Sequence, residues 1–441
     1  MLNKIIDTIS KSFTQWEIFV VKKDRRPLQF QSGACTMIKE SETHGFAIRV
    51  IENGKIGFFA STSWKDTDEI VSRLKNNILF GKDAHFEFVK NSPLNNKIET
   101  YDLDIDNLSN EKIILQGQEV AHKIAEYNPD IDINVALEVE KSEISIINSS
   151  GLNLSEKKSI YSCVIEGTLS CEDEILNIYK SGASGSADLK IMDIAKEFMF
   201  LFEYSKKKAR LGRDTSQLPV IFHPDAIDVL FLPLFHAFNG HNVYHRTSHL
   251  AGKEGMQEFS RSFTLIENPT INCATFSRNF DDEGNPCREK HLVNNGVINE
   301  FLYDLSTARK MNANTTGNGF RSNPASQNIF MEPTTGAMGF AVKEGTISNE
   351  DIVKNTKRGI IIHSLLGVGQ GNVINGDFSN NVHVGFYIEN GEIIGRVKDV
   401  MIAGNSFSCF KNIDCIGNTR LHEKESLSTP YMQFSNINVV S

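Results

Sequence analysis

The sequence has few cysteines and no closely spaced pair of them. Seven cysteines occur among 441 residues, their number is odd, and no CxxC motif is present. A disulfide framework or a cysteine-based structural zinc site is therefore not expected. Scattered thiols are typical of proteins in reducing compartments, so we expect a cytoplasmic location. The seven positions are Cys35, Cys163, Cys171, Cys273, Cys287, Cys409 and Cys415.

Long hydrophobic runs and an excess of positive charge are also missing. No apolar run approaches the roughly 20 residues that a membrane-spanning helix needs. The N-terminal stretch MLNKIIDTISKSF mixes acidic and polar residues with apolar ones, unlike the continuous apolar centre of a signal peptide. The formal net charge is −9, which argues against nucleic-acid binding. We therefore expect neither a membrane nor a nucleic acid among the partners.

The length of the chain and a change in its pattern of helix and strand signals predict more than one domain. A chain of 441 residues is too long for one ordinary hydrophobic core. Helix and strand patterns alternate in the first part, which includes a middle segment from about residue 105, whereas the sequence after Phe263 is β-rich. We predict an α+β fold with a mixed α/β domain over 1–212 and a β-rich, barrel-like domain over 213–441. The boundary is placed between Arg210 and Leu218.

Apolar periodicity predicts the individual elements. Asn53-Gly54 lies between two strand-like runs and predicts a two-residue hairpin. A strand is predicted at 16–22 and a pair of strands over 132–148. Further strands are predicted over 159–169 and 176–181. Helices are predicted over 2–13, 66–79, 109–127, 191–210, 223 to about 240, and 348–356.

Residues 235–249, FHAFNGHNVYHRTSH, hold four of the twelve histidines. On a helix, His241, His245 and His249 share one face, and a pair at i and i+4 is able to chelate a metal. A helical zinc-peptidase site also needs a glutamate beside its first histidine, and none follows either residue of this pair. From spacing alone, ordinary surface or partly buried histidines are the simpler interpretation.

A second pairing in this stretch joins His236 to His241. Residues five apart lie about 140° out of phase on a regular helix, so these two converge only if the helix ends or distorts near Gly240. Glycine costs about 1 kcal/mol in a helix interior, which makes one continuous helix unfavourable here. The spacing of His236 and His241 does not decide whether this pair binds a metal.

Three other stretches are weaker candidates for chemistry. The acidic triplet Asp281, Asp282 and Glu283 is interpreted as turn chemistry. The motif GVGQG at 367–371 is followed by loop and strand patterns, so a nucleotide site is not expected there. The loop NTTGNGFR at 314–321 fits either a peptide-binding cleft or a tight turn.

Several motifs recur in order along nearly the whole chain. They are FDDEG, NNG, FLYDL-TARK and TGNG-R within 280–321, GDFSNNVHVGFYIENGEI at 376–394, IAGN at 402–405, and KIGFFASTSW…DEIVSRL upstream. Together they resemble the TldD/TldE (PmbA) metallopeptidase family, formerly called modulator of DNA gyrase. Ordered motifs at matching spacing make this resemblance more specific than any single motif.

The resemblance implies a particular reading of the histidine stretch. TldD-type members carry HExxxH on a helix, which binds a metal together with a C-terminal cysteine, whereas TldE-type members pair with TldD and lack this set. The HExxxH window corresponds to residues 236–241, with both histidines kept and Ala237 in the glutamate position. The flanking VYHRTSHL resembles the TldE side. The implied metal ligands are His236, His241 and Cys415, and the implied cleft-lining residues are Asn318 and Arg321.

The alanine at position 237 bears directly on catalysis. In a metallopeptidase the metal activates water, and a carboxylate moves the proton of that water, contributing roughly 10² to 10⁴-fold. Alanine is unable to do this. The resemblance therefore implies a TldE/PmbA-like subunit of a cytoplasmic metallopeptidase that cleaves unfolded or leader peptides, paired with a TldD-like catalytic chain or with itself.

Two alternatives remain at this level. One is an independent zinc peptidase that uses His236 and His241 with a base from elsewhere in the chain. The other is a non-enzymatic binding or regulatory protein. Zinc is the metal expected if one is held, and no other cofactor is expected.

Overall fold

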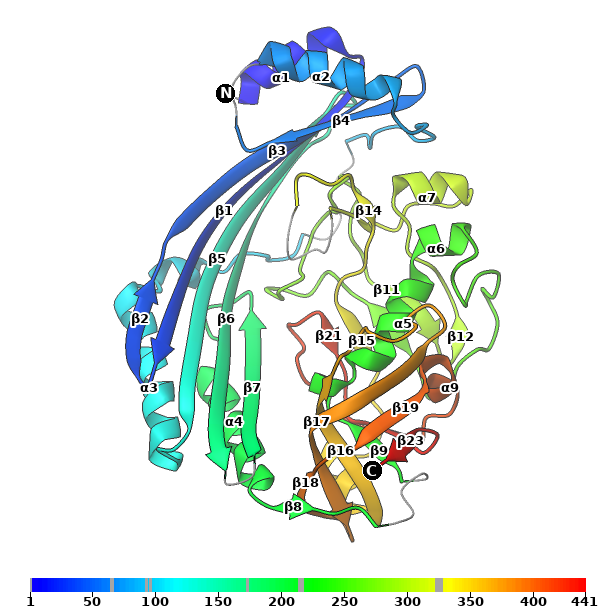
Figure 1. Cartoon of the computed structure of the whole chain (residues 1–441). Helices are drawn as coiled ribbons and strands as arrows, with labels where there is room; N and C mark the ends of the chain where they lie inside the picture. The colour runs from blue at the N-terminus through cyan, green and yellow to red at the C-terminus, as the bar shows by residue number, and fades with distance from the viewer. Residues whose placement is uncertain are drawn as a thin grey trace.

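The computed structural model describes residues 2–63, 67–91, 94, 97–171, 174–212, 218–321 and 328–441. A long curved sheet from the first half of the chain lies beside a β-rich C-terminal part (Figure 1). This arrangement confirms the predicted α+β fold. Residues 213–217, within the interval predicted to join two domains, lie outside the described residues, so that boundary stays a prediction. No helix in the described ranges is long and apolar enough to cross a membrane.

Seven described strands form the N-terminal sheet, in the order β4-β3-β1-β5-β6-β7 with β2 beside β1. The predicted hairpin at Asn53-Gly54 is confirmed, since it joins β3 to β4 with φ angles of 52° and 74°. The strands are β1 (Gln15–Gln31), β2 (Ala34–Ile38), β3 (Ser41–Glu52), β4 (Lys55–Ser61), β5 (Asp132–Asn148), β6 (Asn153–Cys171) and β7 (Glu174–Ser184).

Strand β5 corrects the prediction of two strands over 132–148, because it is a single strand paired with β1 and β6 along its length. Its buried hydrophobic positions are Ile133 to Val139 at odd numbers, then Ile144 and Ile146 at even numbers. The first set packs in one cluster with the helices over 110–127 and 191–205, and the second packs with Leu152 and Phe280. Since alternate residues face opposite sides of a sheet, this change of face gives one strand the hydrophobic pattern of two.

Helices pack on the N-terminal sheet in two groups (Figure 1). The helices over 2–12 and 67–79 lie together at one end of the sheet. The helices over 110–127 and 191–205 pack against each other toward its other end, and the second of them also contacts the C-terminal part. Helix α4 ends at Ser205 rather than at the predicted Arg210, because Lys208 and Ala209 form a short strand, β8, which pairs with β18 (Glu392–Val397). Position 66, a predicted helix residue, lies outside the described residues. The helices are α1 (Leu2–Ser12), α2 (Thr67–Leu79), η1 (Leu103–Asn107), α3 (Asn110–Tyr127) and α4 (Ile191–Ser205).

The C-terminal part is built mainly from short strands, as predicted. Its largest described sheet has the order β20-β22-β9-β16-β17-β18-β8, with β19 paired to β17 and β23 paired to β19. The strands of that sheet are β8 (Lys208–Ala209), β9 (Val220–Phe222), β16 (Arg358–Leu366), β17 (Asp377–Glu389), β18 (Glu392–Val397), β19 (Met401–Asn405), β20 (Cys415–Ile416), β22 (Met432–Phe434) and β23 (Asn438–Val440).

Smaller sheets and short helices complete the C-terminal part. The order β12-β11-β10-β15-β21 makes one sheet, and β13 pairs with β14. The strands are β10 (Leu265–Glu267), β11 (Lys290–Asn294), β12 (Val297–Ile298), β13 (Gly319–Phe320), β14 (Thr334–Thr335), β15 (Phe340–Val342) and β21 (Leu427–Ser428). The helices are η2 (Pro224–Ala226), α5 (Asp228–Phe238), α6 (Gly240–Tyr244), α7 (Leu305–Lys310), α8 (Asn349–Lys354) and α9 (Ser406–Lys411).

Buried ion pairs join the two parts of the molecule. Arg278, from the C-terminal part, pairs with Glu156 of β6 at 3.1 Å and with Asp282 at 2.7 Å. Arg49 of β3 reaches in the other direction and pairs with Glu283 at 3.0 Å. All of these side chains are almost fully enclosed. Charges so deeply buried are tolerated because each has a partner.

The acidic triplet that supplies two of these carboxylates is a turn, as its sequence indicates. The Asp281 carboxylate accepts hydrogen bonds from the backbone N–H groups of Glu283 at 3.0 Å and Asn285 at 2.8 Å. Gly284 follows with a φ of +85°, a conformation that favours glycine. Burial raises the pKa of Asp281 to about 6. The same short segment therefore closes a turn and anchors the interface between the two parts.

Candidate functional site

The histidine stretch predicted as a metal site does not form one helix. Helix α5 ends at Phe238, and Asn239 then caps a separate helix, α6, by accepting a hydrogen bond from the His241 N–H at 2.9 Å. Gly240 is required at this break, since a Cβ there would lie 2.3 Å from the Leu302 carbonyl oxygen. The helix predicted from 223 to about 240 is thus a 3-10 turn followed by helix α5, and α6 begins only at Gly240.

The two histidines of the HExxxH window have different surroundings. His236 is partly buried, its Nδ1 lies 3.1 Å from the Asn242 side-chain amide, and its Nε2 is enclosed without a hydrogen-bond partner among the described residues. His241 is exposed and its ring lies 4.5 Å from that of His245. Burial lowers the pKa of both His236 and His241. Both imidazoles are therefore mainly neutral at neutral pH.

The structure does not bring the predicted metal ligands together. Cys415 lies in β20, where its sulfur is 3.9 Å from the Ile416 carbonyl oxygen. His236, His241 and Cys415 are all described, yet they do not form a group of ligand atoms within 4.8 Å of one another. Ala237, at the position of the catalytic glutamate, is 1% exposed and belongs to the hydrophobic core. As placed, these residues do not fit the family's metal.

The two predicted cleft-lining residues are also enclosed. Asn318 is completely buried, and its amide donates hydrogen bonds to Glu267 at 2.9 Å and to the Gly336 carbonyl at 2.9 Å. Arg321 is 1% exposed, with its guanidinium 4.8 Å from the centre of the Phe19 ring. In this conformation both side chains hold neighbouring segments in place and neither is accessible to a peptide.

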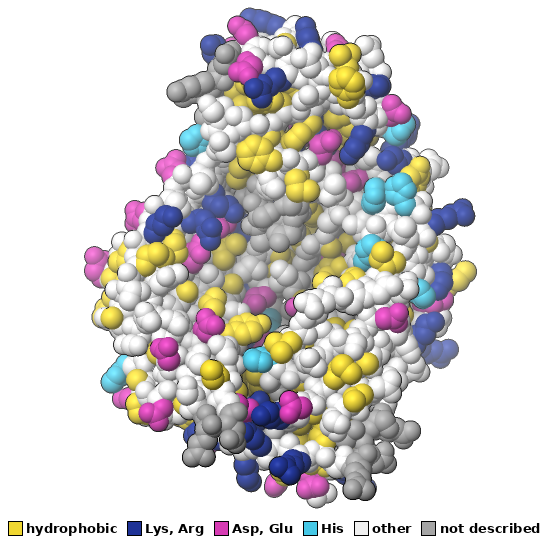
Figure 2. Space-filling view, in the orientation of Figure 1, with side chains coloured by type: hydrophobic (Ala, Val, Ile, Leu, Met, Phe, Trp, Pro, Cys, Tyr) yellow, Lys and Arg dark blue, Asp and Glu magenta, His cyan; other side chains and the backbone are white. Residues whose placement is uncertain are grey.

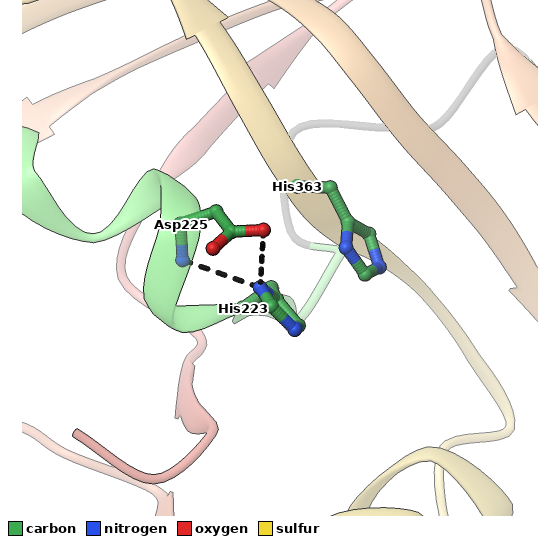
Figure 3. A group of neighbouring side chains, drawn as sticks. All are labelled: His223, Asp225 and His363. Carbon is green, nitrogen blue, oxygen red and sulfur yellow. Dashed lines mark hydrogen bonds and ion pairs between the residues drawn. The ribbon is translucent and has the colours of Figure 1, made fainter. Parts of the chain in front are cut away.

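One cluster of metal-ligand residue types does converge, and the sequence did not indicate it. Of the described residues, only His223, Asp225 and His363 form a group of three or more whose ligand atoms lie within 4.8 Å (Figure 3). His223 and Asp225 flank the proline that opens η2, a segment interpreted from sequence as a helix start. His363 lies 140 residues further on, so no spacing rule connects it to the other two.

Strand pairing explains how these residues meet. Strands β9 and β16 are parallel neighbours, and the His223 N–H donates to the Ile362 carbonyl oxygen at 2.9 Å. His223 directly follows the end of β9, and His363 lies within β16, one residue after the Ile362 that pairs with Phe222. Their ring centroids are 4.4 Å apart. The His223 Nδ1 accepts a hydrogen bond from the Asp225 N–H at 3.2 Å, which places the carboxylate of Asp225 beside it.

Asp225 is the electrostatic centre of this cluster. Lys180 of β7 donates to its Oδ2 at 2.6 Å, and His422 lies 2.8 Å from its Oδ1. Burial alone would raise the pKa of Asp225, but His223, His422 and Lys180 together hold it well below its usual range. Burial would lower the pKa of His422, but its bonds to Asp225 and Glu425 raise it to about 10. Asp225 is thus a carboxylate and His422 an imidazolium.

His363 differs from His422 in its charge. Burial and the neighbouring His223 hold the pKa of His363 well below its usual range. Its imidazole contacts the rings of His223 and Phe386 and makes no hydrogen bond to the described residues. A neutral ring with a free nitrogen lone pair is available there for a ligand.

A cavity of about 630 Å³ opens beside this cluster, between the N-terminal sheet and the C-terminal part. Lys180, Asp225, His363, His383 and His422 all line it. The molecule is hollowed between its two parts in the space-filling view (Figure 2). A cavity of this size accommodates a small molecule or a short peptide segment.

A second cavity, of about 440 Å³, lies near the HExxxH window. His241 and Asn242 line it together with Arg49, Glu283 and Asp304. Neither His236 nor Cys415 is among its lining residues. The two candidate sites are therefore separate, and only the first gathers a convergent ligand set.

Comparison with known proteins places the chain in a family. The PmbA/TldA metallopeptidase C-terminal domain matches residues 215–441, and domain 1 of the same family matches residues 16–78. An uncharacterized protein of Methanocaldococcus jannaschii is 26% identical over 437 residues, which cover 98% of both chains. Metalloprotease PmbA of Escherichia coli O157:H7 is 28% identical over 204 residues, 46% of this chain and 42% of that one.

A solved structure shows the same fold. The crystal structure of TldE from Thermococcus kodakarensis matches with a TM-score of 0.88 over 100% of both chains, at 22% identity. The architecture is thus common to the two proteins from end to end. Taken with the two domain matches and the ordered motifs, this chain belongs to the PmbA/TldA metallopeptidase family, the TldD/TldE (PmbA) family that its sequence resembles.

Proposed function

We propose that this chain is a TldE-like, non-catalytic subunit of a cytoplasmic metallopeptidase that cleaves unfolded or leader peptides. Its catalytic partner is a TldD-like chain with an intact HExxxH motif. The observation that carries the proposal is Ala237, enclosed in the core at the position where the family's catalytic glutamate is expected. Without a carboxylate there, the chain has no group at this position to move a proton of the attacking water.

Other features of the structure support this reading. His236, His241 and Cys415 lie apart, whereas a catalytic zinc normally has three converging protein ligands and one open position. Six cysteines are free, namely Cys35, Cys163, Cys273, Cys287, Cys409 and Cys415, which suits a reducing compartment. The cavity between the two parts of the molecule is a place where a peptide segment could be held.

The proposal is tested by assaying the chain alone and with a TldD-like chain from the same cell. We expect the isolated chain to hydrolyse an unstructured peptide negligibly, with or without added zinc, and the mixture to be active. Sedimentation should show a stable complex, since durable interfaces typically bury more than about 1,000 Å². Robust turnover by the isolated chain that disappears in His236→Ala would instead support the independent peptidase.

Restoring the missing carboxylate provides a second test. We expect Ala237→Glu in the isolated chain to remain without measurable peptidase activity, because the three expected ligands do not converge around position 237. The measurement is peptide turnover at saturating zinc, beside circular dichroism to confirm folding. Peptide turnover by the folded variant would show that Ala237 alone accounts for the lack of peptidase activity.

A further inference from the structure

We propose that His223, Asp225 and His363 bind a divalent transition metal such as zinc, at a site separate from the HExxxH window. Their ligand atoms all lie within 4.8 Å of one another (Figure 3). Two imidazoles and one carboxylate are a donor set that zinc and similar ions favour. The ligand atoms of a tetrahedral zinc lie about 3.3 Å apart, so side-chain adjustments of about 1 Å close the set around an ion.

The backbone already fixes two of the three ligands. His363 lies within β16 and His223 immediately follows β9, each next to one of the residues Ile362 and Phe222 that are paired in the sheet. Their rings are stacked with an interplanar angle of 25°. Both side chains are enclosed, with exposed fractions of 5% and 7%. Ligands held on rigid strands lose little freedom when an ion binds, which favours affinity.

Lys180 is the competitor that a metal has to displace. Its ammonium lies 2.6 Å from the Asp225 Oδ2 and 2.7 Å from Glu197. Because Glu197 remains as its partner, Lys180 can release Asp225 without being left as an unpaired buried charge. His422 stays on the other oxygen of Asp225, at 2.8 Å, and orients the carboxylate as outer partners of metal ligands commonly do.

The position of the site also leaves the ion accessible. Asp225 and His363 line the cavity of about 630 Å³, so the ion would face that space on one side. Three protein ligands with an open position describe a site that takes water or a small donor molecule as its fourth ligand. The inference does not depend on a TldD-like partner, because all three ligands come from this chain.

The site is tested on the isolated full-length chain, first stripped of metal with a chelator. Zinc binding is measured by calorimetry, and cobalt binding by its visible absorption. We expect about one equivalent to bind, His363→Gln to weaken binding at least about 100-fold, and Lys180→Gln to tighten it about tenfold. The opposite effects on zinc affinity distinguish His363, as a ligand, from Lys180, which competes with the metal for Asp225.

Matched controls use other histidines of the same chain. His383→Gln changes a cavity-lining histidine outside the ligand set, and His236→Ala changes the HExxxH window, so both should keep wild-type affinity. Thermal unfolding verifies that each variant is folded. Binding that is unchanged in His363→Gln, or lost in His236→Ala, overturns the proposal. If His363→Gln does not fold, unchanged or weaker binding by Lys180→Gln overturns it as well.

Discussion

Replacing Arg278 with methionine is expected to lower the free energy of unfolding by about 3–5 kcal/mol. The guanidinium is 1% exposed and pairs with Glu156 at 3.1 Å and Asp282 at 2.7 Å. Methionine fills part of the space but supplies no charge and no donors. The variant therefore leaves two enclosed carboxylate oxygens without their cation, which is the costly way to break a buried ion pair.

An exposed ion pair in the same part of the chain provides the control for Arg278. Arg288 pairs with Glu300 at 2.6 Å, but its side chain is 51% exposed. Water and salt screen such a pair, so Arg288→Met should cost less than about 1 kcal/mol. Both variants are compared by urea unfolding at neutral pH. Equal and small losses would mean that the buried network contributes no more than a surface pair.

The turn that supplies Asp282 shows where sequence reasoning works and where it stops. The triplet at 281–283 and the glycine after it indicate a turn through local chemistry alone, and the structure has that turn. Arg278, which pairs with Asp282, lies four residues before it, but Arg49, which pairs with Glu283, comes from the distant strand β3. A sequence does not reveal which cation a buried carboxylate meets, because that depends on how the sheets pack.

For the secondary structure too, local patterns predict the elements well, and the errors arise where tertiary contacts decide the outcome. Helices with clear apolar periodicity, and the hairpin at Asn53-Gly54, were predicted close to their observed limits. The hydrophobic pattern of β5 predicts two strands because its buried residues change from one face of the sheet to the other, where they join a different hydrophobic cluster. Helix α4 was extended too far because the pairing of Lys208 with Arg396 is a tertiary contact.

The candidate metal ligands also differ in whether the sequence alone indicates them. The family resemblance implies His236 and His241 as ligands, and their spacing is visible in the sequence. The convergent cluster instead joins His223 and Asp225 to His363 across 140 residues, through a parallel strand pair. Periodicity and motif spacing describe neighbours along the chain, so this cluster became visible only with the sheet order known.

Lys158 is the clearest case of a buried charge that lowers the stability of the fold. It lies in β6 with 5% of its surface exposed. Burial, followed by the nearby Arg278, lowers the pKa of Lys158 from 10.5 to about 7, against the smaller attraction of Glu156 and Glu140. The folded chain thus holds this proton much more weakly than the unfolded chain does.

Replacing Lys158 with methionine is therefore expected to raise the free energy of unfolding by about 4 kcal/mol at pH 7. Methionine has similar length and no charge to desolvate, so the core keeps its packing. The carboxylates lose little, because Glu156 retains Asn279 at 2.7 Å and Glu140 retains Lys23 at 3.0 Å. Lys157→Met is the control, since that neighbouring side chain is exposed, and it should change stability by less than about 0.5 kcal/mol.

The pH dependence of Lys158→Met distinguishes relief of a buried charge from better packing. A lysine whose pKa is lower in the folded state binds fewer protons there, so wild-type stability rises with pH between about 7 and 10.5. The variant lacks this dependence. Its advantage should be full below pH 7 and should shrink steadily toward pH 10.5, as followed by urea unfolding at several pH values. A constant advantage across that range would assign the gain to hydrophobic packing, and no gain at pH 7 would mean that Lys158 is not penalised in the folded chain.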